Sequence, residues 1–147
     1  MKLYHVWSRL MTKRHMIPFI VSLSVFMESL DSTVINTAIP AISHALHADP
    51  VDLKIALISY LLSLAIFIPI SGWIADKFGS KNVFITAVVI FTMSSLWCGF
   101  ANNLMELSIA RFIQGVGGAL GLPVGRLILI RVVGRENLII TMGRVIT

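Results

Sequence analysis

The sequence predicts an all-α membrane protein with four transmembrane helices and the start of a fifth. Hydrophobic residues make up 56% of the 147 residues and charged residues only 13%, whereas soluble domains usually carry about 25% charged residues. The apolar residues gather in long runs, of the roughly 20 residues that a helix needs to cross a hydrocarbon core about 30 Å thick. Because backbone groups in lipid must be hydrogen-bonded within their own segment, runs of this length favour helices over strands.

Four apolar runs give the expected spans, at about 17–39, 55–75, 83–101 and 104–127. Turn-forming residues mark the three connections, at Asp49-Pro50, 76–82 and Asn102-Asn103. The last apolar piece, at 138–147, is about half the length of a span and is expected to begin a fifth helix. We therefore expect a basic cytoplasmic segment at 1–16 and an incomplete transmembrane bundle at 17–147.

The positions of Lys and Arg predict the orientation in the bilayer. Nine of these residues fall on one side of the alternating path: Lys2, Arg9, Lys13, Arg14, Lys77, Lys81, Arg126, Arg131 and Arg135. The opposite side has only Lys54. Since cytoplasmic loops carry the excess of basic residues, we expect a cytoplasmic amino terminus and a location in the bacterial inner membrane.

Several function classes have no support in the sequence. The formal net charge of +5 does not indicate nucleic-acid binding, because the basic residues form no stripe interleaved with aromatic residues. It is interpreted from where the Lys and Arg residues lie relative to the bilayer. The single cysteine, Cys98, excludes an intrachain disulfide. The histidines lack metal-ligand spacing, and no nucleophile elbow or phosphate-binding loop is present. We expect no enzyme, cofactor, metal site or nucleic-acid partner.

Three charged residues lie well inside the predicted spans, away from the span ends, where a charge costs at least about 2.5 kcal/mol. Glu28 and Asp31 are three residues apart in the first span and share a helix face, and Arg111 lies in the fourth. Asp31 is eight residues from the outer end of its span and Arg111 seven from the outer end of its own. At about 1.5 Å per residue both lie about 10–12 Å deep. We therefore expect Asp31 and Arg111 to form a direct or water-bridged ion pair.

These residues also suggest proton coupling. Burial disfavours the charged form of a carboxyl and a nearby guanidinium favours it, so small changes in hydration or distance would load and unload a proton. On this interpretation Glu28, one turn deeper, is a second carboxyl whose proton affinity depends on its neighbours. The alternatives are that Asp31 and Arg111 only tie two helices together, and that Glu28 stays protonated or bonds a backbone carbonyl.

The fourth span also carries small residues at regular intervals. Gly117, Gly121 and Gly125 recur every four residues, a pattern typical of close helix packing in membranes. Pro123 is expected to bend the helix near its inner end. Gln114 is three residues from Arg111 and near the same face, so we expect it to line a substrate cavity.

The connection between the second and third spans has a distinct composition. Gly72 would allow close approach at the helix end, and Gly79 would permit the turn that reverses the chain. Lys77 and Lys81 would hold the loop at the anionic cytoplasmic face.

Asp76 stands among these basic residues and needs a partner. We expect it to pair with Arg126, at the inner end of the fourth span, or to meet the positive amino end of another helix. The alternative is an ordinary basic loop with a solvated aspartate.

Three stretches together resemble signatures of the major facilitator superfamily. Residues 72–81 resemble its loop signature, 111–119 its fourth-helix signature, and 30–40 the first-helix signature of the drug:proton antiporter branch with 14 spans, the EmrB/QacA-like proteins. The resemblance covers the chain from about residue 17 to its end. It implies the amino-terminal half of a major facilitator fold and the proton-coupled export of hydrophobic or cationic compounds.

The resemblance also implies roles for individual residues. Asp31 matches the acidic residue of the first helix, Arg111 the arginine associated with proton handling, and Asp76 the aspartate that latches two halves of the transporter. Asn36, in the first-helix signature, is expected to line the substrate cavity with Gln114. Ser80 departs from the loop signature, which usually has a basic residue there.

Length is the larger departure, since family members have twelve or fourteen spans and the fifth-helix signature is missing. The interpretation is therefore a truncated, inactive portion of a multidrug exporter, with the remainder of the transporter as a partner beside lipid, protons and drug. Two alternatives stay open: a non-transporting membrane subunit, and a small four-helix exporter that works as a dimer.

Overall fold

The computed structural model describes the backbone of residues 2–49 and 51–133 and the side chains of residues 17–49 and 51–131. The described residues form four helices and no strand: α1 (Lys2–Leu46), α2 (Leu53–Phe78), α3 (Ser80–Phe100) and α4 (Leu104–Val133). Each contains a segment long and apolar enough to cross a membrane. The predicted all-α membrane fold is therefore confirmed, whereas the expected fifth helix at 138–147 lies outside the described residues.

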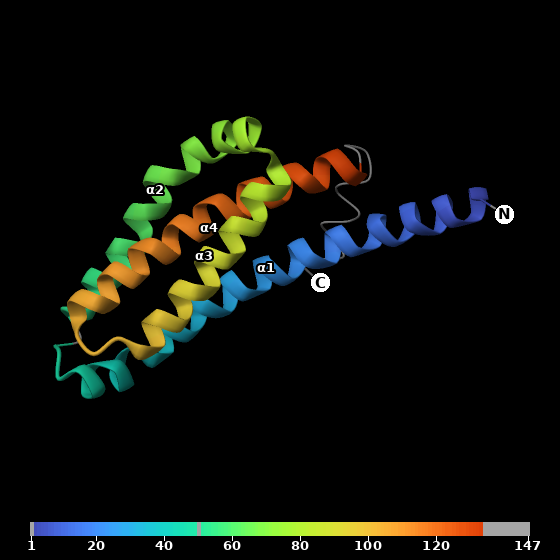
Figure 1. Cartoon of the computed structure of the whole chain (residues 1–147). Coiled ribbons are helices and arrows are strands. Elements are labelled where there is room, and N and C mark those ends of the chain that lie inside the picture. Colours follow the sequence, from blue (N-terminus) through green and yellow to red (C-terminus); the bar gives the residue numbers. More distant parts are fainter. Residues whose placement is uncertain (1, 50, 134–147) are drawn as a thin grey trace.

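α4 is the central element of the bundle. It packs most extensively against α2 and α3 and less against α1, and Figure 1 shows it running between α2 and α3. In its apolar window 56% of the residues are buried, against 6% in α1. Residues of α4 are therefore largely enclosed by protein, whereas few side chains in the apolar window of α1 are buried by the described helices.

α1 is longer than the sequence predicted at both ends. It begins at Lys2, within the segment expected to be cytoplasmic, and continues past 39 and through Pro40. It closes with a Schellman motif, in which His47 adopts φ of 49° and the Ala48 N–H donates to the Ser43 carbonyl. Proline removes one backbone donor without ending this helix, because local capping sets the end.

The other two connections are short and locally specified. Gly79 alone joins α2 to α3, and its φ of 85° lies in the region that favours glycine, so the predicted turn is confirmed. At the start of α4, the Glu106 N–H donates to the Asn103 side chain at 2.9 Å, and the Glu106 carboxylate accepts from the Asn102 N–H at 2.9 Å. This reciprocal capping ends the α3–α4 connection and begins α4.

Two apolar clusters lie towards opposite ends of the bundle, and polar side chains occupy the layer between them. The cluster near the α2–α3 connection contains Val21, Ala75, Val83, Phe84, Ala87, Leu120, Val124 and Leu129. The cluster near the other two connections contains Leu53, Ala56 and Leu107, with Ile39, Ile42 and Leu46 packed against it. Along α4, Arg111 and Gln114 fall between Leu107 and Leu120. The buried polar residues are thus separated from both ends of the bundle by apolar packing.

Glycines allow α4 to approach its two main neighbours closely. A β-carbon at Gly117 would lie 2.7 Å from the backbone nitrogen of Phe91 on α3. One at Gly115, outside the predicted glycine stripe, would lie 2.7 Å from Cβ of Ser63 on α2. Both positions therefore require glycine for the observed helix spacing.

The rest of the predicted stripe faces α1 and α3. A β-carbon at Gly121 would lie 3.1 Å from Oε1 of Glu28, and one at Gly125 would lie 3.1 Å from both Val21 and Phe84. The stripe therefore packs against two helices, with only Gly117 set directly against backbone.

Two local expectations turn out differently. Nothing described lies within 4 Å of a β-carbon built at Gly72, so the expected close approach there is not made by the described helices. α4 continues as a helix through Pro123 to Val133, six residues beyond the predicted end at 127, and the expected bend at Pro123 stays a prediction.

Replacing Gly117 by alanine should destabilise the bundle, because the added methyl group meets the α3 backbone, which cannot move alone. We expect a loss of about 1–3 kcal/mol in the free energy of unfolding, measured by denaturant titration in detergent micelles. Gly99→Ala is the matched control, since nothing lies within 4 Å of its β-carbon position. Equal effects of the two substitutions would contradict this account of the packing.

Candidate functional site

The site centres on an ion pair between α1 and α4. Nη1 of Arg111 donates to Oδ2 of Asp31 at 2.7 Å, and the two side chains are 7% and 17% exposed. The contact predicted from depth counting is therefore present. Arg111 Nε is buried and has no hydrogen-bond partner in the part of the chain described. A guanidinium stays charged at any relevant pH, so Arg111 is a fixed positive charge beside the Asp31 carboxyl.

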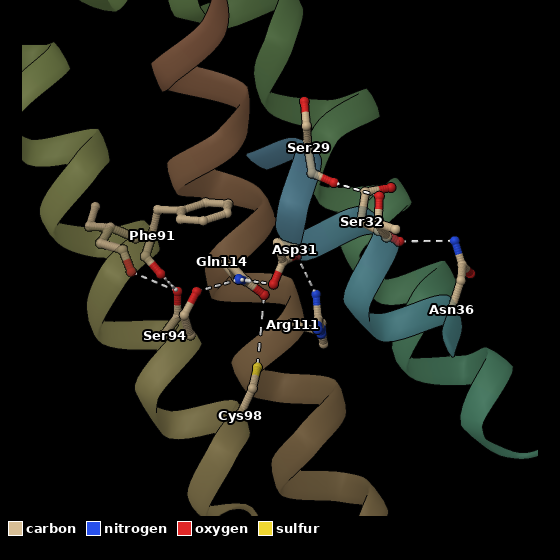
Figure 2. A network of polar contacts seen from close by, with 12 residues as sticks. Ser29, Asp31, Ser32, Asn36, Phe91, Ser94, Cys98, Arg111 and Gln114 are labelled. Carbon is tan, nitrogen blue, oxygen red and sulfur yellow. Dashed lines mark hydrogen bonds and ion pairs between the residues drawn. The ribbon is translucent and has the colours of Figure 1, made fainter. Parts of the chain in front are cut away.

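Gln114 joins the pair to α3. Its Nε2 donates to Oδ1 of Asp31 at 2.9 Å and to Oγ of Ser95 at 2.6 Å. Its Oε1 accepts from the thiol of Cys98, with sulfur and oxygen 3.8 Å apart. Figure 2 shows Gln114 between Asp31 on one side and Ser94 and Cys98 on the other.

Two cavities open beside the ion pair, and Asp31 and Arg111 line both. One of about 180 Å³ is lined by Asp31, Ser32, Ile35, Asn36, Leu57, Tyr60, Leu61 and Arg111. Another of about 330 Å³ lies between α1, α3 and α4 and is mainly apolar, with Cys98 and Ser95 in its wall. Asn36 thus lies at a cavity as expected, whereas Gln114 lines neither and is fully buried. In the described residues Gln114 bridges α1 and α3, and its expected place at a substrate cavity stays a prediction.

Glu28 lies one turn deeper than Asp31, at the glycines of α4. Its Oε1 is 3.1 Å from the β-carbon position of Gly121 and 3.8 Å from that of Gly118. It also lines a small space of about 10 Å³, together with Ser24 and Gly117. The carboxyl is therefore held inside the protein in a notch that the missing glycine side chains create.

A second ion pair lies at the far end of α4, and its arginine is not the predicted one. Asp76 Oδ1 accepts from Nη2 of Arg131 at 3.3 Å, and Nη1 of Arg131 donates to Oγ of Ser80 at 3.0 Å. Arg126 is exposed and is not the partner. Arg131 is displaced from it by about 7.5 Å along the helix and about 140° around it, which places Arg131 beside the end of α2.

The lysines of this loop lie on the surface. Lys77 and Lys81 are exposed, as expected for a loop at the membrane surface. The Lys77 ammonium lies 4.7 Å from the ring centre of Trp73 and 5.5 Å from that of Phe78. These distances are typical of cation–π contacts, which hold the lysine against the end of α2.

Sequence reasoning missed three residues of the site. Ser95 and Cys98 on α3 bond Gln114, and Tyr60 on α2 lines the cavity that contains Asp31. Ser95 and Cys98 are three residues apart and hence on one helix face, which was a usable signal. The direction in which that face points depends on packing and could not be counted from the sequence.

Comparison with known proteins gives one family and a consistent set of relatives. The Major Facilitator Superfamily profile matches residues 21–147. The "Putative multidrug resistance protein MdtD" of Shigella flexneri serotype 5b (strain 8401) is 46% identical over 124 residues, which cover 84% of this chain and 26% of that protein. Proteins of the same name from Escherichia coli O1:K1 / APEC and Shigella boydii serotype 18 are 45% identical over the same lengths. The chain thus spans about a quarter of the length of these relatives.

Breaking one side of the buried ion pair should cost more than replacing both. Arg111→Gln leaves the Asp31 carboxylate without its cation, and we expect a loss of about 3–5 kcal/mol in the free energy of unfolding. The double variant Asp31→Asn, Arg111→Gln should recover most of this loss, because two amides can bond each other. Denaturant unfolding in micelles measures both. A double variant no more stable than Arg111→Gln would contradict the view that the unpaired carboxylate causes the loss.

The loop ion pair should be weak and specific to Arg131. Because its arginine and aspartate side chains are 56% and 70% exposed, a double-mutant cycle of Asp76→Asn with Arg131→Gln should give a coupling of about 0.2–1 kcal/mol that falls with added salt. The same cycle with Arg126→Gln is the control and should give none. Coupling to Arg126 instead would contradict the observed geometry.

Proposed function

The chain belongs to the Major Facilitator Superfamily, and from this premise we propose that it provides the proton-coupling part of an exporter of hydrophobic or cationic drugs. The printed name of its MdtD relatives supports multidrug transport. Family membership at the level of sequence removes the small four-helix exporter as an alternative. The buried pair of Asp31 and Arg111 at the wall of two cavities is the observation that carries the proposal.

Asp31 is the proposed proton site. As an ion it is held by Arg111 and Gln114, and its side chain keeps 17% exposure at the edge of a cavity. Protonation removes its charge and weakens its attraction to Arg111, which frees α1 to move relative to α4. Glu28, in its notch one turn deeper, is proposed as a second proton-exchanging carboxyl on the same face of α1.

The polar face of α1 supports a water-filled or substrate-filled space beside this site. Ser29, Thr33 and Asn36 are exposed and donate to carbonyls of their own helix at 2.9 Å. Such a face is costly against lipid and is accommodated by water or protein. With Tyr60 and Leu61 lining the same cavity as Asp31, the space combines apolar and aromatic surface with a carboxylate. This chemistry suits a hydrophobic or cationic compound.

The remaining assignments concern the membrane surface. We assign a cytoplasmic amino terminus, because nine basic residues lie on that side and one on the other. On this assignment the loop pair of Asp76 and Arg131 is the cytoplasmic latch, with Lys77 and Lys81 at the headgroups. Gly72 and Gly79 frame the latch loop, and Arg126 is one of the surface charges.

Transport also needs a second bundle. Alternating access in this architecture is the rocking of two bundles around a site between them. The four described helices form one packed unit around α4, with the polar face of α1 uncovered. We therefore propose that activity requires further helices, from the same polypeptide or from another, opposite α1.

Asp31→Asn should abolish proton-coupled flux while leaving assembly intact. The test places residues 21–147 of this chain in the matching segment of an MdtD relative, beside the 147-residue chain alone, and measures dye efflux from vesicles driven by a proton gradient. We expect flux in the chimera to fall to background with Asp31→Asn, because the amide cannot exchange a proton. Asp31→Glu, which retains a carboxyl, should keep part of the flux.

The outcomes separate the readings. Equal flux with Asp31→Asn would refute proton coupling at this residue. A chimera that inserts and folds but moves no dye would refute the transport proposal and favour the non-transporting subunit. Flux by the 147-residue chain alone would refute the need for further helices.

A further inference from the structure

We propose that the Gln114 side-chain amide reverses its hydrogen bonds when Asp31 takes up a proton, and that Ser95 and Cys98 on α3 are the positioning residues that make this reversal discrete. The inference rests on the proposed function, in which Asp31 is the proton site. It assigns α3 a part in proton coupling that neither the sequence signatures nor the ion pair assigns.

In the observed state every contact of Gln114 has a definite direction. Both of its N–H groups donate, one to Oδ1 of Asp31 and one to Oγ of Ser95, and its oxygen accepts from the Cys98 thiol. An ionised carboxylate only accepts, so this arrangement fits the charged form of Asp31. The network as observed is therefore complementary to Asp31 without its proton.

A proton on Asp31 conflicts with this arrangement. Oδ2 faces Nη1 of Arg111, which has no acceptor, so that oxygen cannot donate towards the arginine. The proton is therefore placed on Oδ1, where its O–H meets an N–H of Gln114. Two donors facing each other in a buried site leave both unsatisfied, which is costly.

A half-turn of the Gln114 amide about its last torsion removes the conflict. The amide oxygen then accepts from the Asp31 O–H and from the Ser95 hydroxyl, which rotates to donate. One amide N–H turns to the sulfur of Cys98, a weak acceptor, and the second N–H gives up its acceptor. All three contacts keep their partners and reverse their direction, and the torsion is roughly two-fold, so the turn needs little extra space.

The reversed state is the less stable of the two when Asp31 is charged. In this orientation the amide oxygen faces the carboxylate, so two acceptors meet. At Cys98, the bond from the thiol to the amide oxygen is replaced by a bond from an amide N–H to sulfur, a weaker acceptor. Gln114 is 0% exposed, so bulk water does not compensate for a wrong orientation. The amide therefore takes one of two orientations, and the protonation state of Asp31 determines which one.

Other titratable groups face this site from each helix. Arg111 faces Asp31 from α4, Tyr60 lines its cavity from α2, and Cys98 lies behind Gln114 on α3. Glu28 lies one turn away on α1. Cys98 is the only cysteine of the chain, so its thiol is a single, built-in spectroscopic reporter.

The test is an infrared pH titration of the full 147-residue chain in lipid vesicles. The carboxylic C=O band that disappears in Asp31→Asn reports the proton on Asp31, and the S–H stretching band reports the Cys98 contact. On acidification we expect the S–H band to shift to higher wavenumber, because the thiol loses its oxygen acceptor. The shift should have the same midpoint as the Asp31 band.

Substitutions test which residues connect the proton on Asp31 to the S–H band of Cys98. In Asp31→Asn the S–H band should stay constant with pH, and in Gln114→Leu it should stay at the unbonded position at every pH. Asn82→Leu is the matched control, an amide on α3 outside this site whose side chain donates to the Phe78 carbonyl, and should preserve the shift.

Three results would overturn the inference. An Asp31 band that titrates while the S–H band stays fixed would refute the amide reversal and leave the proposed proton site intact. An S–H shift that persists in Asp31→Asn would refute the link to Asp31. An Asp31 carboxyl that never titrates would refute both the reversal and the proposed function.

Discussion

The burial of one carboxylate against one guanidinium constrains the rest of this bundle. Removing two charges from water costs several kcal/mol each, and their attraction offsets this only with good geometry and further hydrogen bonds. The 2.7 Å contact supplies the geometry, and Gln114 supplies the further bond to Asp31. The close approach of α4 to α2 and α3 at Gly115 and Gly117 then keeps that layer enclosed. The glycines of α4 thus maintain the close helix packing that keeps the ion pair enclosed.

Part of this arrangement is readable from residue spacing alone. Helix rise is constant, so counting from the span ends placed Asp31 and Arg111 at one depth, and they meet. Rotation is harder, because residue spacing does not determine which face of a helix turns towards its neighbour. The loop ion pair shows this: Arg126 and Arg131 lie about 140° apart around α4, and Arg131 is the partner of Asp76.

Contacts that depend on packing were not predictable in the same way. Ser95 and Cys98 stand in an apolar run that reads as an ordinary span, and only the placement of α3 against α4 turns them towards Gln114. The end of α1 was missed for a different reason. The predicted span ends at 39 with the apolar run, but the Schellman closure at His47 decides where the helix ends.

The two ion pairs of α4 differ in environment, and this difference determines how readily each pair separates. The pair of Asp76 and Arg131 is more than half exposed, so water competes with it and thermal motion opens it readily. The pair of Asp31 and Arg111 is enclosed, and separating it while both groups stay charged is costly. Neutralising Asp31 lowers that cost, whereas the loop pair needs no such trigger. The exposed pair can therefore open and close as the helices move, whereas the buried pair separates at low cost only after Asp31 is neutralised.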